Sequence, residues 1–519
     1  MMTKRALFVV SGLLLAAGSA RAAAAAAAAT APEITMFGGE PSRNMASDEK
    51  GLPTKFDPAS GVNVKWVANL GSQSYGGPIV GGGKVYVGTN NEGLRNPKLT
   101  GDRGVLAAFD VKDGKFLWQA AFPKLPAGRV NDWPLQGICS TPAIEGDRIY
   151  YVSNRAEVVC ADTEGFLDKE NDGPVKDEAD ATEIDQDVLW KYDMIGELDV
   201  FPHNLAAGNP LLVGDVIYTV TGNGVDEGHV NIPSPTSPSF IALDKNTGKL
   251  LWESALPGEK ILHGQWSNPA YGVIKGKPQV IFAGGNGWLY SLDPKTGSLL
   301  WSFDCNPKDA VWRIGGAGTR NYIISTPVIW DDKVYIGVGQ DPEHGEGVGH
   351  LWAIDATGSG DVTGKGVVWT RGGEDFHRTM STVAIDGDGI LYISDLSGYL
   401  YALDAKTGQH FWTYNTYAAI WGSPYVADGK VYLGDEDGDI VVLRTGKKME
   451  VLHEVNMGSS VYTTPVAKDG VLYVATRAKL YAIQEGTGKQ PAPAPAKPDA
   501  PKPEAPKADP PKPPAPEVF

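Results

Sequence analysis

Cysteine is scarce in this sequence: Cys139, Cys160 and Cys305 are the only three among 519 residues. None of them has the spacing of a metal-ligand pair, and an odd count leaves at least one thiol without an intramolecular partner. We therefore expect buried, unreactive thiols and a fold that disulfide bonds do not hold together.

Long hydrophobic runs are also missing, apart from Ala6–Ala17, which is too short to span a bilayer stably. This run follows the basic residues Lys4 and Arg5 and precedes small residues around Arg21. Such an arrangement is typical of a secretory signal peptide. We predict a signal peptide over residues 1–22, export to the periplasm or the medium, and no membrane span.

Positive charge is in the minority, because 46 lysines and arginines face 62 aspartates and glutamates, for a formal net charge of −16. Nucleic acid and anionic lipid would not be attracted to such a chain. The charge is typical of a soluble surface. The expected partners are therefore proteins or small molecules, and nucleic acid is excluded as the main one.

Glycine and tryptophan, by contrast, are plentiful, with 64 and 14 residues, and they recur in one phrase. Ala-x-Asp-x-x-Thr-Gly-x-x-x-Trp is complete in Ala242–Trp252 and in Ala402–Trp412, and altered or stretched copies bring the number to eight. A small or polar residue followed by proline precedes each copy. These prolines, with Val383 standing in once, are Pro78, Pro142, Pro210, Pro269, Pro327, Pro424 and Pro465.

Each copy predicts four short antiparallel strands. The proline opens the first strand, where a missing N–H does least harm, and the Thr-Gly pair makes the tight turn before the last strand. Four-stranded units repeated about every 40–50 residues are typical of propeller blades. We predict an all-β, eight-bladed β-propeller over residues 64–484, in which the otherwise unattached strand Val64–Ala68 completes the last blade and closes the ring.

Two segments outside the propeller differ in composition. Residues 23–60 are rich in alanine and predict an irregular lead-in to the first blade. Residues 490–519 are rich in proline, which predicts a disordered, extended tail. The tail is interpreted as a spacer or, alternatively, as a stalk that contacts the cell envelope.

The repeated phrase resembles that of pyrroloquinoline-quinone dehydrogenases and of their non-catalytic relatives, which include the propeller of the outer-membrane assembly machinery. In the catalytic members the resemblance implies a quinone and Ca²⁺ in the central funnel, with an aspartate as base. Asn223 is similar to the family's amide ligand of the metal. Asn321, followed by Tyr322, is similar to an amide–aromatic pair that touches the cofactor.

Three departures from the catalytic pattern stand against quinone chemistry. Ser140 follows Cys139, so the vicinal disulfide of many members cannot form. Residues 263–268 contain no carboxylate where the base is expected, and residues 284–287 contain no arginine to meet the quinone. The resemblance therefore implies the fold, and we predict no bound quinone.

The loops before the first strands are expected to gather at one mouth of the channel, where aromatic and cationic side chains would converge. From these loops we select five candidates for binding a ligand: Trp312, Arg313, His377, Arg378 and Trp421. Such groups suit a small molecule or a peptide segment. The alternative is that these aromatic side chains only cap the blade interiors.

An acidic insertion holds the one candidate for a metal. Asp168, Glu170 and Asp172 place oxygen donors at alternate positions, and Gly173 stands where a calcium loop turns sharply. Ala179 occupies the twelfth place, where a calcium loop has an acidic residue. The insertion therefore predicts either a Ca²⁺ site or a solvated acidic loop, and the sequence shows no clustered His/Cys zinc set elsewhere.

Together these features predict an exported propeller that acts as a binding or assembly platform without quinone chemistry. The competing hypothesis is a quinone- and calcium-dependent alcohol or sugar dehydrogenase with an atypical pocket.

Overall fold

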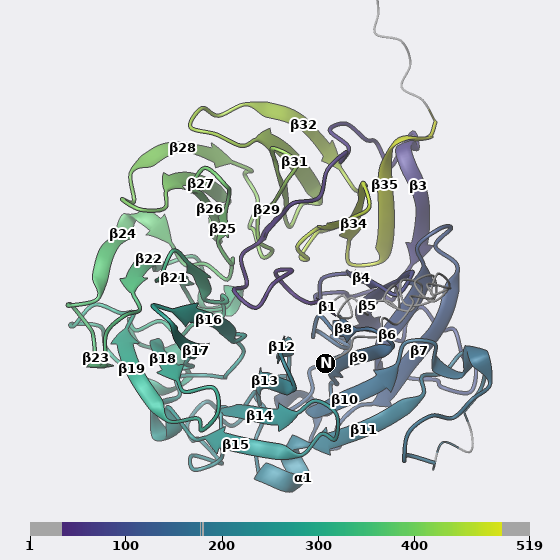
Figure 1. The fold of residues 1–519 in the computed structure, drawn as a ribbon, viewed down its shortest axis with the longest axis horizontal. Coiled ribbons are helices and arrows are strands. Elements are labelled where there is room, and N and C mark those ends of the chain that lie inside the picture. Colours follow the sequence, from purple (N-terminus) through teal and green to yellow (C-terminus); the bar gives the residue numbers. More distant parts are fainter. Residues whose placement is uncertain (1–33, 177, 179–180, 490–519) are drawn as a thin grey trace, which may run out of the picture.

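The computed structural model describes residues 34–489 except 177 and 179–180. The strands form eight sheets arranged in a ring around a central channel (Figure 1). The described residues contain a single α-helix, α1 (Met194–Leu198). The predicted eight-bladed propeller is confirmed. The predicted signal peptide and proline-rich tail lie outside the described residues.

The eight sheets follow one another along the chain. Blades one to four are β4 (Ile79–Gly81), β5 (Lys84–Asn90), β6 (Arg103–Asp110), β7 (Phe116–Pro123); β8 (Ala143–Glu145), β9 (Arg148–Val152), β10 (Glu157–Asp162), β11 (Val188–Asp193); β12 (Leu211–Val213), β13 (Val216–Val220), β14 (Phe240–Asp244), β15 (Leu250–Ser254); and β16 (Ala270–Ile274), β17 (Lys277–Ala283), β18 (Trp288–Leu292), β19 (Leu299–Asp304). Blades five to eight are β20 (Val328–Trp330), β21 (Lys333–Val338), β22 (Val348–Asp355), β24 (Val367–His377); β25 (Ala384–Ile385), β26 (Ile390–Ser394), β27 (Tyr399–Asp404), β28 (His410–Asn415); β29 (Tyr425–Ala427), β30 (Lys430–Gly434), β31 (Asp439–Arg444), β32 (Val451–Asn456); and β33 (Val466–Lys468), β34 (Val471–Ala475), β35 (Lys479–Gly488), β3 (Val62–Asn69). The additional short elements are β1 (Ile34–Thr35), β2 (Ala46–Ser47), β23 (Gly360–Asp361), and the 3₁₀ turns η1 (Gly128–Val130), η2 (Gly165–Asp168), η3 (Gly258–Lys260), η4 (Ile314–Gly316) and η5 (Pro342–His344).

The first strand of every blade begins one residue after the recurring proline, or after Val383 in the sixth blade. The polar residue before the proline has a role of its own. Thr382 N–H donates to Ser423 Oγ at 2.9 Å, and Ser423 N–H donates to Thr464 Oγ1 at 3.0 Å. Equivalent bonds run between most neighbouring blades, so these polar residues join the inner strands in a circle around the channel.

The eighth blade is completed by the beginning of the chain, as predicted. Strand β3 pairs antiparallel with β35, and Trp66 lies opposite Ala482. Strand β35 ends at Gly488, four residues beyond the predicted limit of the propeller. This pairing leaves the ring without an open edge.

A tryptophan on the outer strand fastens each of seven blades. Trp252, for example, lies so close to the Thr-Gly turn of the next blade that a Cβ on Gly297 would come within 2.7 Å of its ring. Its Nε1–H donates to Pro294 O at 2.9 Å. Trp66, Trp118, Trp190, Trp369 and Trp412 bond the following blade in the same way. Trp301 differs, because Gln279 of its own blade accepts its N–H.

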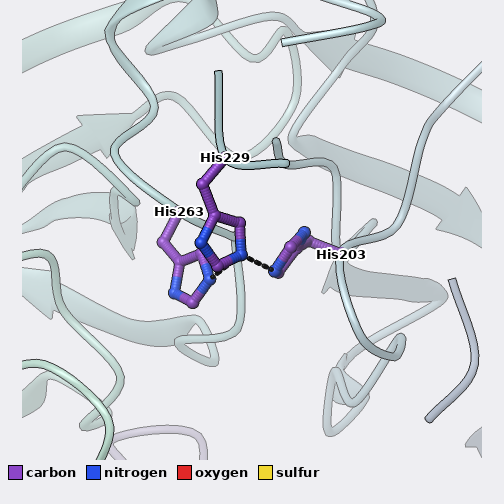
Figure 2. Close-up of side chains that lie close together, drawn as sticks. All are labelled: His203, His229 and His263. Atoms are coloured by element: carbon purple, nitrogen blue, oxygen red, sulfur yellow. Dashed lines mark hydrogen bonds between the residues drawn. The ribbon is translucent and has the colours of Figure 1, made fainter. Parts of the chain in front are cut away.

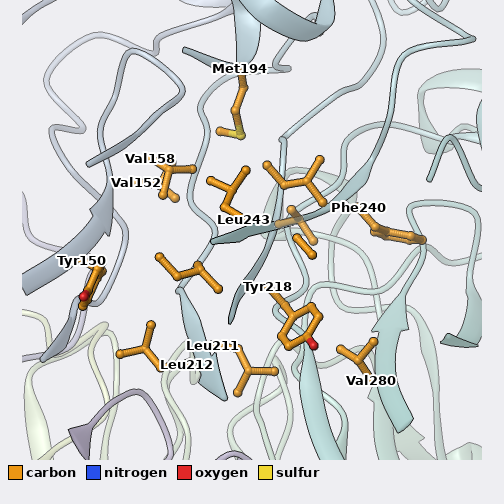
Figure 3. Packing of buried hydrophobic residues seen from close by; sticks show 14 of the residues in the cluster. Tyr150, Val152, Val158, Met194, Leu211, Leu212, Tyr218, Phe240, Leu243 and Val280 are labelled. Atoms are coloured by element: carbon orange, nitrogen blue, oxygen red, sulfur yellow. The ribbon is translucent and has the colours of Figure 1, made fainter. Parts of the chain in front are cut away.

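The hydrophobic core is divided among the contacts between blades. Figure 3 shows one such layer, in which Tyr150 and Val158 of the second blade face Leu211 and Leu243 of the third, with Val280 of the fourth beside them. All five side chains are fully buried. Burial of this kind supplies most of the favourable free energy of folding.

The N-terminal segment, residues 34–57, crosses the ring near its axis, as the purple trace in Figure 1 shows. β1 pairs with β8, and β2 pairs parallel with β29. Between them, the side chain of Arg43 is fully buried and donates to Phe37 O, Asn209 O, Pro210 O and Pro269 O at 2.7–3.2 Å. The irregular lead-in predicted from the sequence thus contacts the inner strands and lies across one end of the channel.

The three cysteines are free thiols: Cys160 and Cys305 are buried, and Cys139 is half-buried. The described residues include no helix with the length and hydrophobicity needed to cross a membrane.

Candidate functional site

A pocket of about 300 Å³ lies at the open end of the channel. Seven of the eight loops that lead into first strands contribute to it, which confirms that these loops gather at one mouth. Its lining includes Tyr75, Trp133, Cys139, Leu205, Trp266, Ile324, Met380 and Trp421. A deeper space of about 220 Å³ shares many of these residues and reaches Phe37 of the N-terminal segment. The N-terminal segment therefore contributes to the inner end of the pocket.

One side of the pocket is aromatic. The ring of Trp421 lies 4.6 Å from that of Tyr462, and Tyr462 is stacked on Tyr75 at 5.3 Å. The Nε1 atom of Trp421 is buried and has no hydrogen-bond partner in the described part of the chain. An unpaired buried donor is costly to the folded state.

The opposite side of the pocket carries negative charge. Asp341 and Glu343 line it, and no described lysine or arginine does. Burial alone would raise the pKa of Asp341, but hydrogen bonds from His263 and Tyr322 bring it below its ordinary value. The carboxylate is therefore ionised at neutral pH. Pyrroloquinoline quinone is itself a polycarboxylate, so the charge of this lining does not suit it.

Three histidines meet beside the pocket (Figure 2). His203 comes from the β11–β12 loop, His229 from the β13–β14 loop and His263 from the β15–β16 loop. The Nε2 atom of His229 lies 3.2 Å from Nε2 of His203 and 3.2 Å from Nε2 of His263. His203 and His263 are fully buried, and His229 is half-buried.

The other ring nitrogens of the two buried histidines are held by oxygen atoms. His203 Nδ1 lies 2.8 Å from Val225 O, and His263 Nδ1 lies 3.1 Å from Tyr322 Oη and 3.3 Å from Asp341 Oδ2. Burial, with the nearby His263, lowers the pKa of His203 to about 3, and burial lowers that of His229. His203 is therefore neutral at pH 7, the state in which imidazole binds metals.

These histidines were missed in the sequence, and the prediction of no clustered His/Cys set was wrong. They are separated by 26 and 34 residues, so no local metal-binding spacing exists. One signal was available: His203 and His263 stand seven and six residues before the prolines of consecutive blades. Aligning the repeats would have placed these two side by side, but His229 lies in a loop of variable length.

Four of the seven predicted cofactor residues, Trp421, Asn321, Arg378 and Asn223, have different surroundings. Trp421 lines the pocket. Asn321 is buried outside the pocket lining, and its Oδ1 accepts from Arg378 Nε at 3.0 Å. Asn223 is also buried, and its amide oxygen and nitrogen bond Phe201 N and Ser234 O.

The remaining three lie apart from the pocket lining. Trp312 and Arg313 are exposed, and Trp312 donates to Lys260 O at 2.8 Å. His377 Nδ1 lies 3.2 Å from the buried carboxylate of Asp395. The structure therefore does not bring the seven predicted residues together at one place.

The acidic insertion gathers a slightly different set of carboxylates from the one predicted. Asp168 and Asp172 lie within 4.8 Å of Asp162, which ends β10, whereas Glu170 is exposed and outside this group. Burial, with the negative charges of neighbouring aspartates, raises the pKa of Asp162 to about 6. A cation would relieve this repulsion, and Ca²⁺ binding at the loop stays a prediction.

The raised pKa of Asp162 has a consequence for stability. The folded state binds the proton of the Asp162 carboxyl more tightly than the unfolded state does. The resulting contribution of Asp162 to the free energy of unfolding is therefore fully present below about pH 4 and is lost as pH rises through about 6. Asp162→Asn should therefore raise the free energy of unfolding at pH 7 by about 1 kcal/mol and leave it unchanged at pH 4. Urea unfolding at the two pH values measures this, and an equal effect at both would contradict it.

The fold and the pocket define an eight-bladed propeller with an aromatic and acidic cavity at the centre of the ring. A family profile described as outer membrane protein assembly factor BamB matches residues 40–166, 185–362 and 349–496. The chain belongs to this family.

Individual relatives differ in their activities. A tetrathionate hydrolase of Acidithiobacillus ferrooxidans is 23% identical over segments that cover 58% of this chain and 60% of that protein. Outer membrane protein assembly factor BamB of Yersinia pestis is 21% identical, over 55% of this chain and 63% of that protein. The chain thus matches less than two thirds of the length of either relative.

Among solved structures, a quinohemoprotein alcohol dehydrogenase from Pseudomonas putida is similar to this chain, with a TM-score of 0.55 and 16% identity. The match covers 91% of this chain and 83% of that one, and it shows a common fold. The family thus includes assembly factors, and the fold is shared with quinone enzymes.

Proposed function

We propose that this protein is an exported binding platform, periplasmic or secreted, whose pocket holds an apolar or basic group of a protein segment or small molecule, without quinone chemistry. The observation that carries the proposal is the pocket lining, which combines the aromatic ring of Trp421 with the carboxylates of Asp341 and Glu343. Aromatic rings with nearby carboxylates favour ligands that are flat, apolar or positively charged.

The same lining disfavours the competing hypothesis of a quinone-dependent dehydrogenase. A quinone with several carboxylates needs cations, and Arg378, which was predicted to contact the cofactor, donates instead to Asn321 Oδ1 and Gly345 O. Beyond the pocket, the net charge of −16 favours a protein or small-molecule partner over nucleic acid. The proline-rich tail would contact the cell envelope and hold the propeller near it.

A titration with pyrroloquinoline quinone and Ca²⁺ tests the proposal that the pocket does not bind a quinone. We expect no saturable heat in calorimetry and no change in quinone absorbance at high micromolar concentrations, because the pocket repels the carboxylates. One-to-one binding would contradict the proposal and favour a dehydrogenase, to be followed with alcohol and sugar substrates and a dye acceptor.

Two short peptides that differ only in charge test the proposal that the pocket binds an apolar or basic group. A peptide with one aromatic residue beside lysine should quench tryptophan fluorescence saturably, and its glutamate counterpart should bind at least tenfold more weakly. Trp421→Ala should weaken the lysine peptide at least tenfold, whereas Trp312→Ala, on the exposed surface, should leave its affinity unchanged. Equal affinities of the two peptides, or equal effects of the two variants, would overturn the assignment of the pocket.

A further inference from the structure

The three histidines of Figure 2 have a geometry that hydrogen bonding alone does not satisfy. His203 Nδ1 faces only a backbone carbonyl, so this nitrogen carries the proton and Nε2 carries a lone pair. His263 Nδ1 faces a carboxylate, which assigns the same tautomer. Both lone pairs are thus directed at Nε2 of His229. One N–H of His229 can satisfy only one of them.

A metal ion would satisfy both lone pairs together with that of His229. Zinc–nitrogen bonds of about 2.0–2.1 Å in a tetrahedral site separate neighbouring ligand nitrogens by about 3.3–3.4 Å. The two Nε2–Nε2 distances from His229 are 3.2 Å each, and one ring nitrogen of each histidine falls within 4.8 Å of the others. The Nε2 atom of His229 is therefore already spaced from both of the others as in one tetrahedral ion site.

The surroundings of the cluster also match those of metal-binding histidines. In such sites the ring nitrogen that does not bind the metal usually donates to a carbonyl or a carboxylate, which fixes the ring. Val225 O does this for His203, and Asp341 does it for His263. Tyr322 in turn donates to Asp341 at 2.5 Å and so holds the carboxylate in place.

We propose that His203, His229 and His263 bind one divalent transition-metal ion of the zinc class through their Nε2 atoms. Neutral imidazoles suit Zn²⁺, Cu²⁺ and Ni²⁺, whereas Ca²⁺ and Mg²⁺ prefer oxygen ligands. The half-buried position of His229 gives the ion a route from solvent. Three protein ligands leave a fourth coordination position for water, as in zinc sites that keep an open position.

The site lies beside the pocket and is distinct from it. Trp266, which lines the pocket, packs edge-to-face on His263 at 5.3 Å, and Asp341, which also lines the pocket, lies 3.3 Å from His263 Nδ1. A bound ion would therefore fix the wall against which a pocket ligand packs. The ion's binding can be measured without any pocket ligand, so this proposal and the proposed function can fail separately.

Zinc titration of the metal-stripped, full-length protein, prepared without a histidine tag, tests the site. Competition with a chromophoric chelator should show one Zn²⁺ per chain, and Co²⁺ should give the visible absorption bands of a tetrahedral complex. His229→Ala should weaken Zn²⁺ binding at least 100-fold. His410→Ala, which removes an exposed histidine of β28, is the matched control and should leave the affinity unchanged.

A second variant tests the orientation of the ligands. Asp341→Asn keeps the shape of the carboxyl group but weakens its hold on His263, and should cost about 10–100-fold in Zn²⁺ affinity. Circular dichroism of the metal-free variants should match that of the unsubstituted chain, because His229 lies in a surface loop. Absence of one-to-one Zn²⁺ binding, or equal affinities of His229→Ala and His410→Ala, would overturn the proposal.

Discussion

Arg43→Met should lower the free energy of unfolding by about 3–5 kcal/mol. The guanidinium is fully buried and donates to four backbone carbonyls, two of them in the third blade and one in the fourth. Burial lowers the pKa of Arg43 to about 9, so the group is still charged at pH 7. Methionine fills much of the same volume but leaves these carbonyls without donors, and each buried acceptor left unpaired is costly.

Urea unfolding followed by tryptophan fluorescence measures the effect of Arg43→Met. Arg129→Met is the matched control, because Arg129 makes an ion pair with Glu227 in which both side chains are more than half exposed. Such pairs contribute little, so the control should change stability by less than about 0.5 kcal/mol. A shift in the urea midpoint no larger than that of the control would show that the N-terminal segment is held by other contacts.

Gly297→Ala should lower the free energy of unfolding by about 3–4 kcal/mol. Gly297 has a φ of +69°, and a Cβ there would come within 2.7 Å of the Trp252 ring, which belongs to the preceding blade. The positive φ costs an alanine about 1–2 kcal/mol, and the displaced tryptophan adds the remainder.

Gly276→Ala separates these two contributions within the same blade. Gly276 has a φ of +78°, but a Cβ at this position would meet nothing within 4 Å. Its substitution should therefore cost only about 1–2 kcal/mol. If chemical denaturation gave the same loss for both variants, the contact between tryptophan and glycine would contribute nothing beyond the backbone conformation.

The repeated phrases were informative because each of their residues performs the same task in most blades. The proline precedes the first strand, the polar residue before it joins neighbouring blades, and the glycine leaves room for a tryptophan. The closing strand could also be predicted, because Trp66 supplies the tryptophan that the eighth copy lacks. The period of the sequence was therefore sufficient to predict the propeller architecture.

The buried arginine, the histidine cluster and the acidic loop could not be predicted from the repeat, because most of their residues lie outside the repeated phrases. Arg43 lies in a segment without repeats, and its four acceptors are backbone atoms, which any sequence provides. His229 belongs to a loop whose length is particular to the third blade. Glu170 was chosen for its spacing along the chain, but the loop folds so that Asp162, from the preceding strand, approaches Asp168 and Asp172 instead.

The pairing of β3 with β35 also determines the order in which the molecule can assemble. Gly486 N–H donates to Asn63 Oδ1 across 423 residues, whereas the four main strands of each of the other seven blades pair with neighbours along the chain. Bringing distant segments together is slow, so the eighth sheet waits until nearly the whole polypeptide has emerged. Until then β3 is an unpaired edge, and association between nascent chains would begin at that edge.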